Sequence, residues 1–184
     1  MNANGQPRQY NGLARLLHWS VALLVFGLFA LGYWMRTLDY YSAWYQRAPE
    51  LHTSLGMVLV VLILVRLAWR AMTRTPAALP HSRLEALAGH AAHLALYVLL
   101  IVMGITGYVF ATADGKPISV FGAFELPPLI QSKVAGDLAG DVHEWAAYAI
   151  VGLAVVHALA ALKHHFIDRD DTLRRMTSGV TPRE

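Results

Sequence analysis

The chain has 184 residues, of which 56% are hydrophobic and 15% are charged, and its formal net charge is +3 at pH 7. So apolar a composition at this length favours a small helical membrane bundle over a soluble domain. The chain has no cysteine, which excludes disulfides, iron–sulfur clusters, thiolate-bound haem and covalently attached c-type haem. Methionine and the nine histidines remain as candidate metal ligands.

Four segments, taken in chain order, are apolar enough to span a bilayer, which requires about 20 residues. The first segment, residues 16–35, contains no Asp, Glu, Lys or Arg, and the second, residues 51–69, is interrupted only by Arg66, which can extend to the headgroups. The third contains His90 and His93 but no formal charge, and charged residues flank the fourth. We predict an all-α, integral membrane four-helix bundle forming a single domain, 1–184. Its helices are expected at approximately 13–36, 51–71, 86–112 and 142–166, followed by a solvated tail, 167–184.

Lysines and arginines divide unequally between the two sides of this bundle. If the N-terminus is inside, the inner segments hold most of them, and this excess predicts that both termini of this multi-pass protein are cytoplasmic. The inner residues are Arg8, Arg15, Arg66, Arg70, Arg74, Arg83, Lys163, Arg169, Arg174, Arg175 and Arg183; the outer residues are Arg36, Arg47, Lys116 and Lys133. Because topology accounts for these charges, we expect the lipid bilayer and no nucleic acid as a partner.

His143 and His157 lie at the two ends of the fourth predicted helix. Their separation is close to four helical turns, so both side chains project from nearly the same face, about 21 Å apart. This distance suits two cofactors at two depths and is too long for two ligands of one ion. His52 lies at the outer start of the second helix and His18 near the inner start of the first. The predicted pairs are therefore His52 with His143 and His18 with His157.

Paired histidines at two depths favour haem, whose planar ring takes ligands from opposite sides and needs an apolar slot. Gly56, one turn after His52, is a candidate for lining such a slot, as are Gly104, Gly107 and Gly152. The alternative is that these glycines only allow close helix packing. Zinc fits less well, because neither pair has a carboxylate or third nitrogen in register.

The other histidines have less defined roles. His90 and His93 can contact haem propionates, a quinone or a proton path, or can simply hydrogen-bond a neighbouring helix. His164 and His165 end the fourth helix, where the helix dipole favours an exposed cationic pair. His164 can also face the inner cofactor region, because it lies near two turns after His157.

A set of short motifs follows the predicted helices over nearly the whole chain. They are R-L-L-H-W around His18, L-H-T-S-L-G around His52, G-H-A-A-H-L-A-L-Y, G-K-P-I-S-V-F-G, V-H-E-W around His143, and H-A-L-A-A-L-K-H-H-F followed by D-D-T-L-R-R-M. In this order and spacing the motifs resemble the bacterial cytochrome b561 family of diheme membrane proteins, superoxide oxidase type.

The resemblance implies two non-covalent haem b groups, with iron bound by His18 and His157 on the inner side and by His52 and His143 on the outer side. It also implies that superoxide gives electrons at the outer haem and that ubiquinone is reduced near the inner side. Such a protein is a superoxide:ubiquinone oxidoreductase.

Four side chains are candidates for handling these substrates. Lys116 and Lys133 can steer superoxide electrostatically, and His164, or nearby Asp168, can deliver protons or meet the quinone. Two alternatives stay open. One is a cytochrome b subunit that passes electrons from a separate dehydrogenase to quinone, and the other is a non-catalytic membrane protein with structural histidines.

Overall fold

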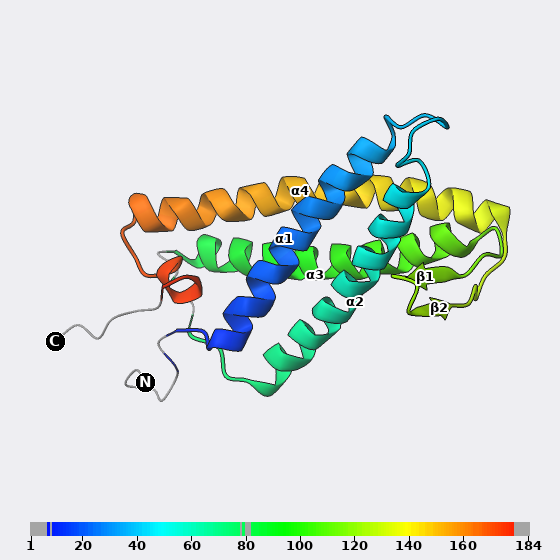
Figure 1. Ribbon diagram of the computed structural model, residues 1–184. Helices are drawn as coiled ribbons and strands as arrows, with labels where there is room; N and C mark the ends of the chain where they lie inside the picture. Colours follow the sequence, from blue (N-terminus) through cyan, green and yellow to red (C-terminus); the bar gives the residue numbers. More distant parts are fainter. Residues whose placement is uncertain (1–6, 8, 78, 80–81, 179–184) are drawn as a thin grey trace.

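Four long helices make up most of the computed structural model, which describes residues 7, 9–77, 79 and 82–178. Each is long and apolar enough to cross a membrane, which confirms the predicted helical membrane bundle. Arg8, Arg183 and the tail after residue 178 lie outside the described residues. The helices are α1 (Gly12–Met35), α2 (Arg47–Met72), α3 (Arg83–Thr112) and α4 (Lys133–Phe166) (Figure 1).

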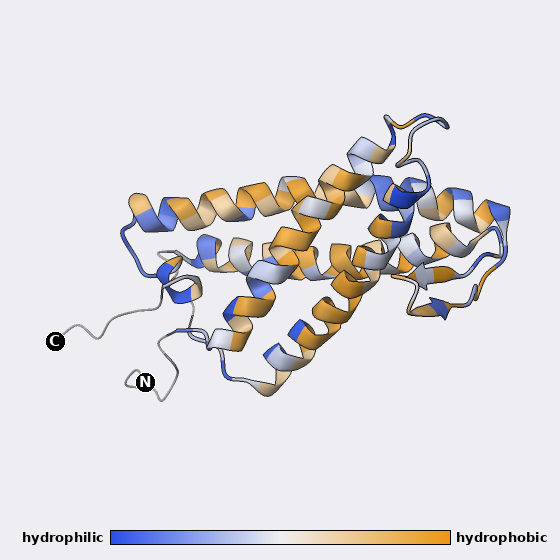
Figure 2. Cartoon of the chain, in the orientation of Figure 1, coloured by the Kyte–Doolittle hydropathy of each residue, from blue (hydrophilic) through white to orange (hydrophobic). Residues whose placement is uncertain are grey.

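Hydrophobic residues predominate in the middle of each helix, and hydrophilic residues are more frequent toward the helix ends (Figure 2). Many of the large apolar side chains face outwards, as Leu23, Ile105 and Val156 do with 75%, 60% and 61% of their surfaces exposed. In water this exposure would be costly, whereas in a bilayer the lipid tails cover it. The outward-facing apolar surface therefore matches a membrane-spanning bundle.

The helices form two antiparallel hairpins that cross each other. Helix α1 packs along α2 and α3 packs along α4, whereas fewer contacts join the two hairpins. A small buried cluster holds the hairpins together where they cross. It comprises Val21, Leu28, Leu59, Ile63, Leu100 and Ile150. Away from this cluster, contacts between α1 and α4 come from Phe29 against Tyr148 at 5.6 Å between ring centroids and from an ion pair of Arg36 with Glu144.

Helix α4 begins at Lys133, earlier than the start expected near residue 142. The Ser132 side chain caps the helix by accepting a hydrogen bond from the backbone N–H of Ala135 at 3.3 Å. The first turns then pack closely on α3, because a side chain at Gly136 would meet Ala113 at 2.4 Å. Hydropathy missed these turns because they are polar and pack against protein. Lys133 is thus the first residue of a helix and does not belong to a loop.

A two-stranded hairpin, absent from the all-α prediction, lies between α3 and α4. Strands β1 (Ile118–Val120) and β2 (Phe124–Leu126) pair antiparallel. Its turn places Gly122 at a φ of 69°, a left-handed conformation that glycine adopts without strain. Ser54 of α2 joins the hairpin to the bundle, because its hydroxyl donates to the Ser119 carbonyl at 3.2 Å and accepts from the Phe121 N–H at 3.1 Å. We call this side of the bundle the loop end.

The opposite side, called the terminal end, carries both ends of the described chain (Figure 1). The described part of the tail folds back onto α1 and includes the short helix η1 (Arg174–Met176). The Trp19 indole donates to the Met176 carbonyl at 2.9 Å, and the Arg15 guanidinium donates to the Thr177 carbonyl at 2.7 Å. Sequence patterns do not reveal these docking contacts, because backbone carbonyls accept them.

Candidate functional site: two histidine pairs between the helical hairpins

At the loop end, His52 of α2 and His143 of α4 face each other across the two hairpins. Their ring centroids are 6.3 Å apart and their planes are inclined by 71°. Nδ1 of His143 lies 3.2 Å from the Met103 carbonyl oxygen, so a proton on Nδ1 donates to that oxygen and leaves Nε2 as a lone-pair donor. Nδ1 of His52 is buried without a hydrogen-bond partner among the described residues.

Two glycines make room for this loop-end pair. A Cβ atom at Gly107 of α3 would lie 2.9 Å from Cε1 of His143, and one at Gly32 of α1 would lie 3.2 Å from Cε1 of His52. Each histidine therefore packs its Cε1 edge against the bare backbone of its hairpin neighbour. This packing fixes the ring position and leaves the other edge of each ring for the opposite hairpin.

At the terminal end, His18 of α1 lies against His157 of α4. Their ring centroids are also 6.3 Å apart, with planes inclined by 76°. A third ring joins them, because His93 of α3 lies 5.2 Å from His157 between centroids. Among the described residues, neither His18 nor His157 makes a hydrogen bond. The structure thus brings together the two histidine pairs that were predicted from their positions along the helices. It also adds His93 to the terminal-end pair.

The spacing within each pair fits a single metal ion. An imidazole nitrogen binds a metal ion at about 2.0 Å, so two imidazoles on opposite sides of one ion have ring centroids about 6.2 Å apart. The spacing of 6.3 Å in both pairs agrees with this value. Each pair also joins two hairpins that share fewer contacts with each other than the helices within each hairpin do.

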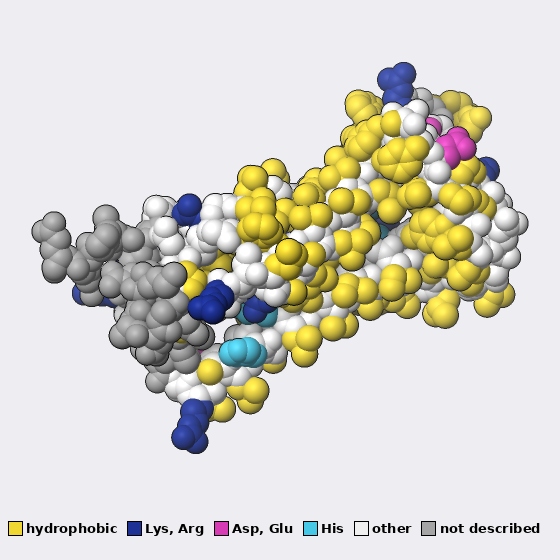
Figure 3. All heavy atoms as spheres, turned by 90° about the horizontal axis from the view of Figure 1, so that it is seen from below, with side chains coloured by type: hydrophobic (Ala, Val, Ile, Leu, Met, Phe, Trp, Pro, Cys, Tyr) yellow, Lys and Arg dark blue, Asp and Glu magenta, His cyan; other side chains and the backbone are white. Residues whose placement is uncertain are grey.

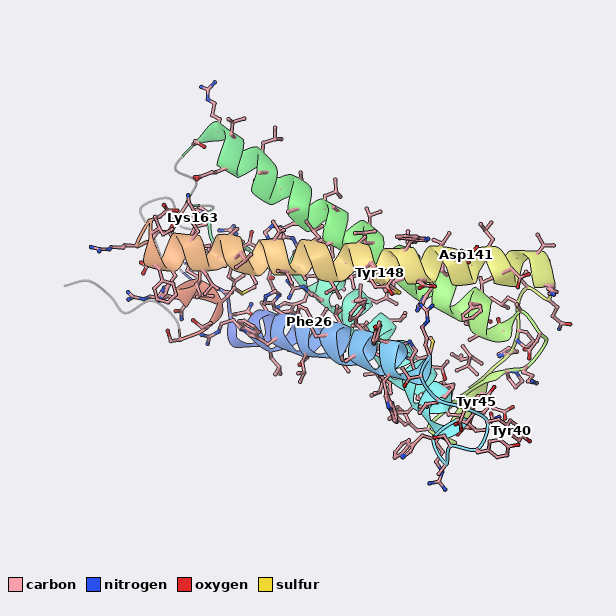
Figure 4. The ribbon with its side chains drawn as sticks, turned by 90° about the horizontal axis from the view of Figure 1, so that it is seen from above. Phe26, Tyr40, Tyr45, Asp141, Tyr148 and Lys163 are labelled. Atoms are coloured by element: carbon pink, nitrogen blue, oxygen red, sulfur yellow. The ribbon has the colours of Figure 1, made fainter. Side chains whose placement is uncertain are left out.

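A polar network lies beyond the terminal-end pair. Nδ1 of His164 is 3.0 Å from Asp168 and 2.9 Å from Asp170, while the Lys163 ammonium bridges Asp168 and Glu85 at 2.8 Å each. Lys163 marks the position of this network at the end of α4 (Figure 4). The sequence suggested His164 and Asp168 from their helical spacing, but not Glu85 or Asp170. Asp170 joins only because the tail folds back.

The two lysines expected to steer an anion have different surroundings at the loop end. Lys116 forms an ion pair with Asp114 at 3.0 Å, and this hydrogen-bonded contact lowers the pKa of the Asp114 carboxyl below its ordinary value. Lys133 forms no ion pair within the described part of the chain. It lines an open cavity of about 450 Å³ together with Phe110, Asp114 and Asp137.

The glycines named from sequence fall into different environments. A Cβ at Gly56 or Gly152 would meet nothing within 4 Å, so both border open space. One at Gly104 would lie 2.9 Å from Val60, which marks Gly104 as a helix-packing position. Gly32 was missed, because it is far from His52 in sequence and only the α1–α2 packing brings them together. The role of Gly56 stays a prediction.

These features define a class: a multi-pass helical membrane protein with paired imidazoles between its helices, suited to holding metal-containing cofactors. The profile of the prokaryotic cytochrome b561 family matches residues 9–179. The chain is 49% identical to "Cytochrome b561 homolog 2" of Escherichia coli, over 96% of this chain and 95% of that protein. It is 29% identical to "Probable superoxide oxidase CybB" of Yersinia pestis, over 92% of this chain and 96% of that protein.

A third relative, "Cytochrome b561 homolog 1" of Escherichia coli, is 28% identical over 87% of this chain and 92% of that protein. The chain belongs to the prokaryotic cytochrome b561 family. It is therefore a multi-pass bacterial membrane protein of electron transfer that binds haem b. The resemblance noted in the motifs is confirmed.

Proposed function

We propose that the protein carries electrons across the bacterial inner membrane from superoxide at the loop end to ubiquinone at the terminal end, with both termini in the cytoplasm. The observation that carries this proposal is the presence of two histidine pairs with equal spacing, 6.3 Å between ring centroids, at opposite ends of α4. The pairs lie about 21 Å apart along that helix, which suits two electron carriers stacked across a bilayer.

Two haems fit the residues present. His18 and His157 would bind one iron and His52 and His143 the other. The hydrogen bond from His143 Nδ1 to the Met103 carbonyl supports this assignment, because it holds the tautomer in which Nε2 can bind iron. Haem held between two imidazoles would supply one-electron transfer without an open coordination position.

The overall reaction balances with two superoxide ions for each quinone. Each superoxide loses one electron and becomes O₂, and ubiquinone takes up two electrons and two protons to become ubiquinol. The name of the Yersinia pestis relative, a probable superoxide oxidase, supports superoxide as the donor. The names of the two Escherichia coli relatives mention no donor, so the donor needs a direct test.

The protein's own residues have two tasks in this scheme. At the loop end, Lys133 attracts the superoxide anion more strongly than Lys116, whose charge is balanced by Asp114. At the terminal end, Nδ1 of His164 is within hydrogen-bond distance of the carboxylates of both Asp168 and Asp170. They can pass protons from the cytoplasm toward the quinone or contact it directly.

The haem assignment is tested by measuring haem per purified chain and reduced-minus-oxidised spectra in four single variants, H18A, H52A, H143A and H157A. Each is expected to lose about one of two low-spin haems. H165A serves as the control, because His165 belongs to neither pair and should keep full haem content. Unchanged haem in all four variants, or a colourless wild-type protein, would overturn the assignment and leave the histidines with a structural role.

The donor is tested by mixing the purified protein with superoxide in a stopped-flow spectrometer and following haem reduction, then ubiquinol formation. Rapid reduction of the isolated protein would support the superoxide reaction. If haem is present but superoxide does not reduce it, and the protein co-purifies with a large soluble dehydrogenase, the function is that of an electron-transfer subunit, and the proposed donor is wrong.

A further inference from the structure

Arg66 of α2 was expected to extend from the membrane to the headgroups, yet it is partly buried and lies over a ring of the neighbouring helix α3. Its guanidinium carbon lies 6.0 Å from the centroid of the Tyr97 ring on α3. It is also close enough to interact electrostatically with both His18 and His157, and with His93. A permanent positive charge thus lies beside the terminal-end pair.

This positive charge has no carboxylate partner within the described part of the chain. Arg66 forms no ion pair or hydrogen bond there, and its one ring contact is with Tyr97. An arginine inside a membrane span is costly unless it is paired. The position therefore favours binding of an anion from outside the described part of the chain.

A second arginine points to the same place. Arg70 lies one turn after Arg66 on α2 and interacts electrostatically with His93. No ion pair of Arg70 occurs among the described residues either. Seen from below, basic and histidine side chains gather side by side in one hollow of a surface that is otherwise largely hydrophobic (Figure 3). Two positive charges and a histidine thus border the space next to the terminal-end pair.

We propose that Arg66, assisted by Arg70, binds the carboxylate side chains of the haem held by His18 and His157. This inference rests on the haem sites of the proposed function. A guanidinium offers two parallel N–H donors that match a carboxylate, and it stays charged at every physiological pH. Haem carries two such carboxylates at one edge of its ring. The contact therefore fixes which edge of the haem faces the terminal end.

The pairing also has an electrostatic consequence. Reduction lowers the positive charge on the haem by one unit, so a nearby cation favours the reduced state. R66Q should therefore lower the midpoint potential of the terminal-end haem by at least the equivalent of a tenfold change in its oxidation equilibrium, about 59 mV for one electron. The potential of the loop-end haem should stay the same.

The experiment is a redox titration of the purified protein, with haem content measured on the same samples. H18A and H52A identify which spectral component belongs to which haem. R74Q is the matched control, because Arg74 lies beyond the end of α2 at the same side of the bundle and is exposed. A shift in R66Q that is absent in R74Q supports the inference, as does selective loss of the terminal-end haem in R66Q. An unshifted potential with full haem content overturns it.

A second variant covers the case in which R66Q does not accumulate as folded protein. R66K keeps the charge but loses the two-pronged donor, so it should move the carboxylate bands of the haem in a redox-difference infrared spectrum. Unmoved bands would overturn the inference. Absence of haem from the wild-type protein would be a different result, because it would refute the proposed function before Arg66 is tested.

Discussion

The two histidine pairs have the same spacing but different surroundings. At the loop end, glycine backbones frame His52 and His143, and the nearby ion pair of Arg36 and Glu144 has no net charge. At the terminal end, the charge of Arg66 faces the pair. On the proposed haem sites, equal spacing suits the same kind of ligand at both ends, and the charge of Arg66 would raise the electron affinity of the terminal-end site. This difference would favour the proposed electron flow from the loop end to the terminal end.

The largest effect is expected from replacing a glycine that packs against the loop-end histidines. G107V should displace His143, because even its Cβ would lie 2.9 Å from the ring, and the protein should lose about one of two haems. The terminal-end haem should be unaffected. Haem content and spectra measure this, with G27V as the control, since Gly27 is exposed and a Cβ there meets nothing within 4 Å. Equal loss of haem in both variants would show that Gly107 has no specific role in positioning His143.

The charge difference predicts an order of potentials. The terminal-end haem should have the higher midpoint potential, by the equivalent of roughly a tenfold difference in oxidation equilibrium or about 59 mV. A redox titration of the wild type resolves two components, and H52A and H18A each leave one of them. If the component that survives in H52A has the lower potential, the electrostatic contrast between the sites is wrong.

The polar network at the terminal end should act on quinone and not on superoxide. D170N removes a carboxylate that contacts His164 at 2.9 Å, and ubiquinol formation should slow by roughly tenfold if the network moves protons. Reduction of the haems by superoxide should keep its rate. D171N is the neighbouring control, because Asp171 contacts Arg174. If D170N slows haem reduction and ubiquinol formation equally, the substitution disturbs the fold and the network has no specific role in proton transfer.

The smallest expected effect concerns steering at the loop end. K133Q should slow superoxide-driven haem reduction by about twofold to threefold at low salt and flatten its salt dependence. K116Q should have less effect, because Asp114 already balances that charge. Stopped-flow rates over a series of salt concentrations compare the two. If the rate of haem reduction has the same salt dependence in both variants and the wild type, the lysines do not steer superoxide.

The sequence was sufficient to predict what depends on periodicity and composition. Four spans followed from hydropathy, and the pairing of His18 with His157 followed from depth along straight helices. It was insufficient where contacts depend on how the helices rotate and cross. Gly32 beside His52, the early start of α4 at Lys133 and the orientation of Arg66 are such cases. Each depends on a neighbour that is distant in the chain.

The docking of the tail on the start of α1 has a consequence for biogenesis. A ribosome makes residues 10–19 early and residues 173–178 only after the whole of α4. Because Trp19 and Arg15 donate to the carbonyls of Met176 and Thr177, this contact can form only when synthesis of the described chain is nearly complete. The helix that carries His18 therefore gains its last support late, and the terminal end matures after the loop end.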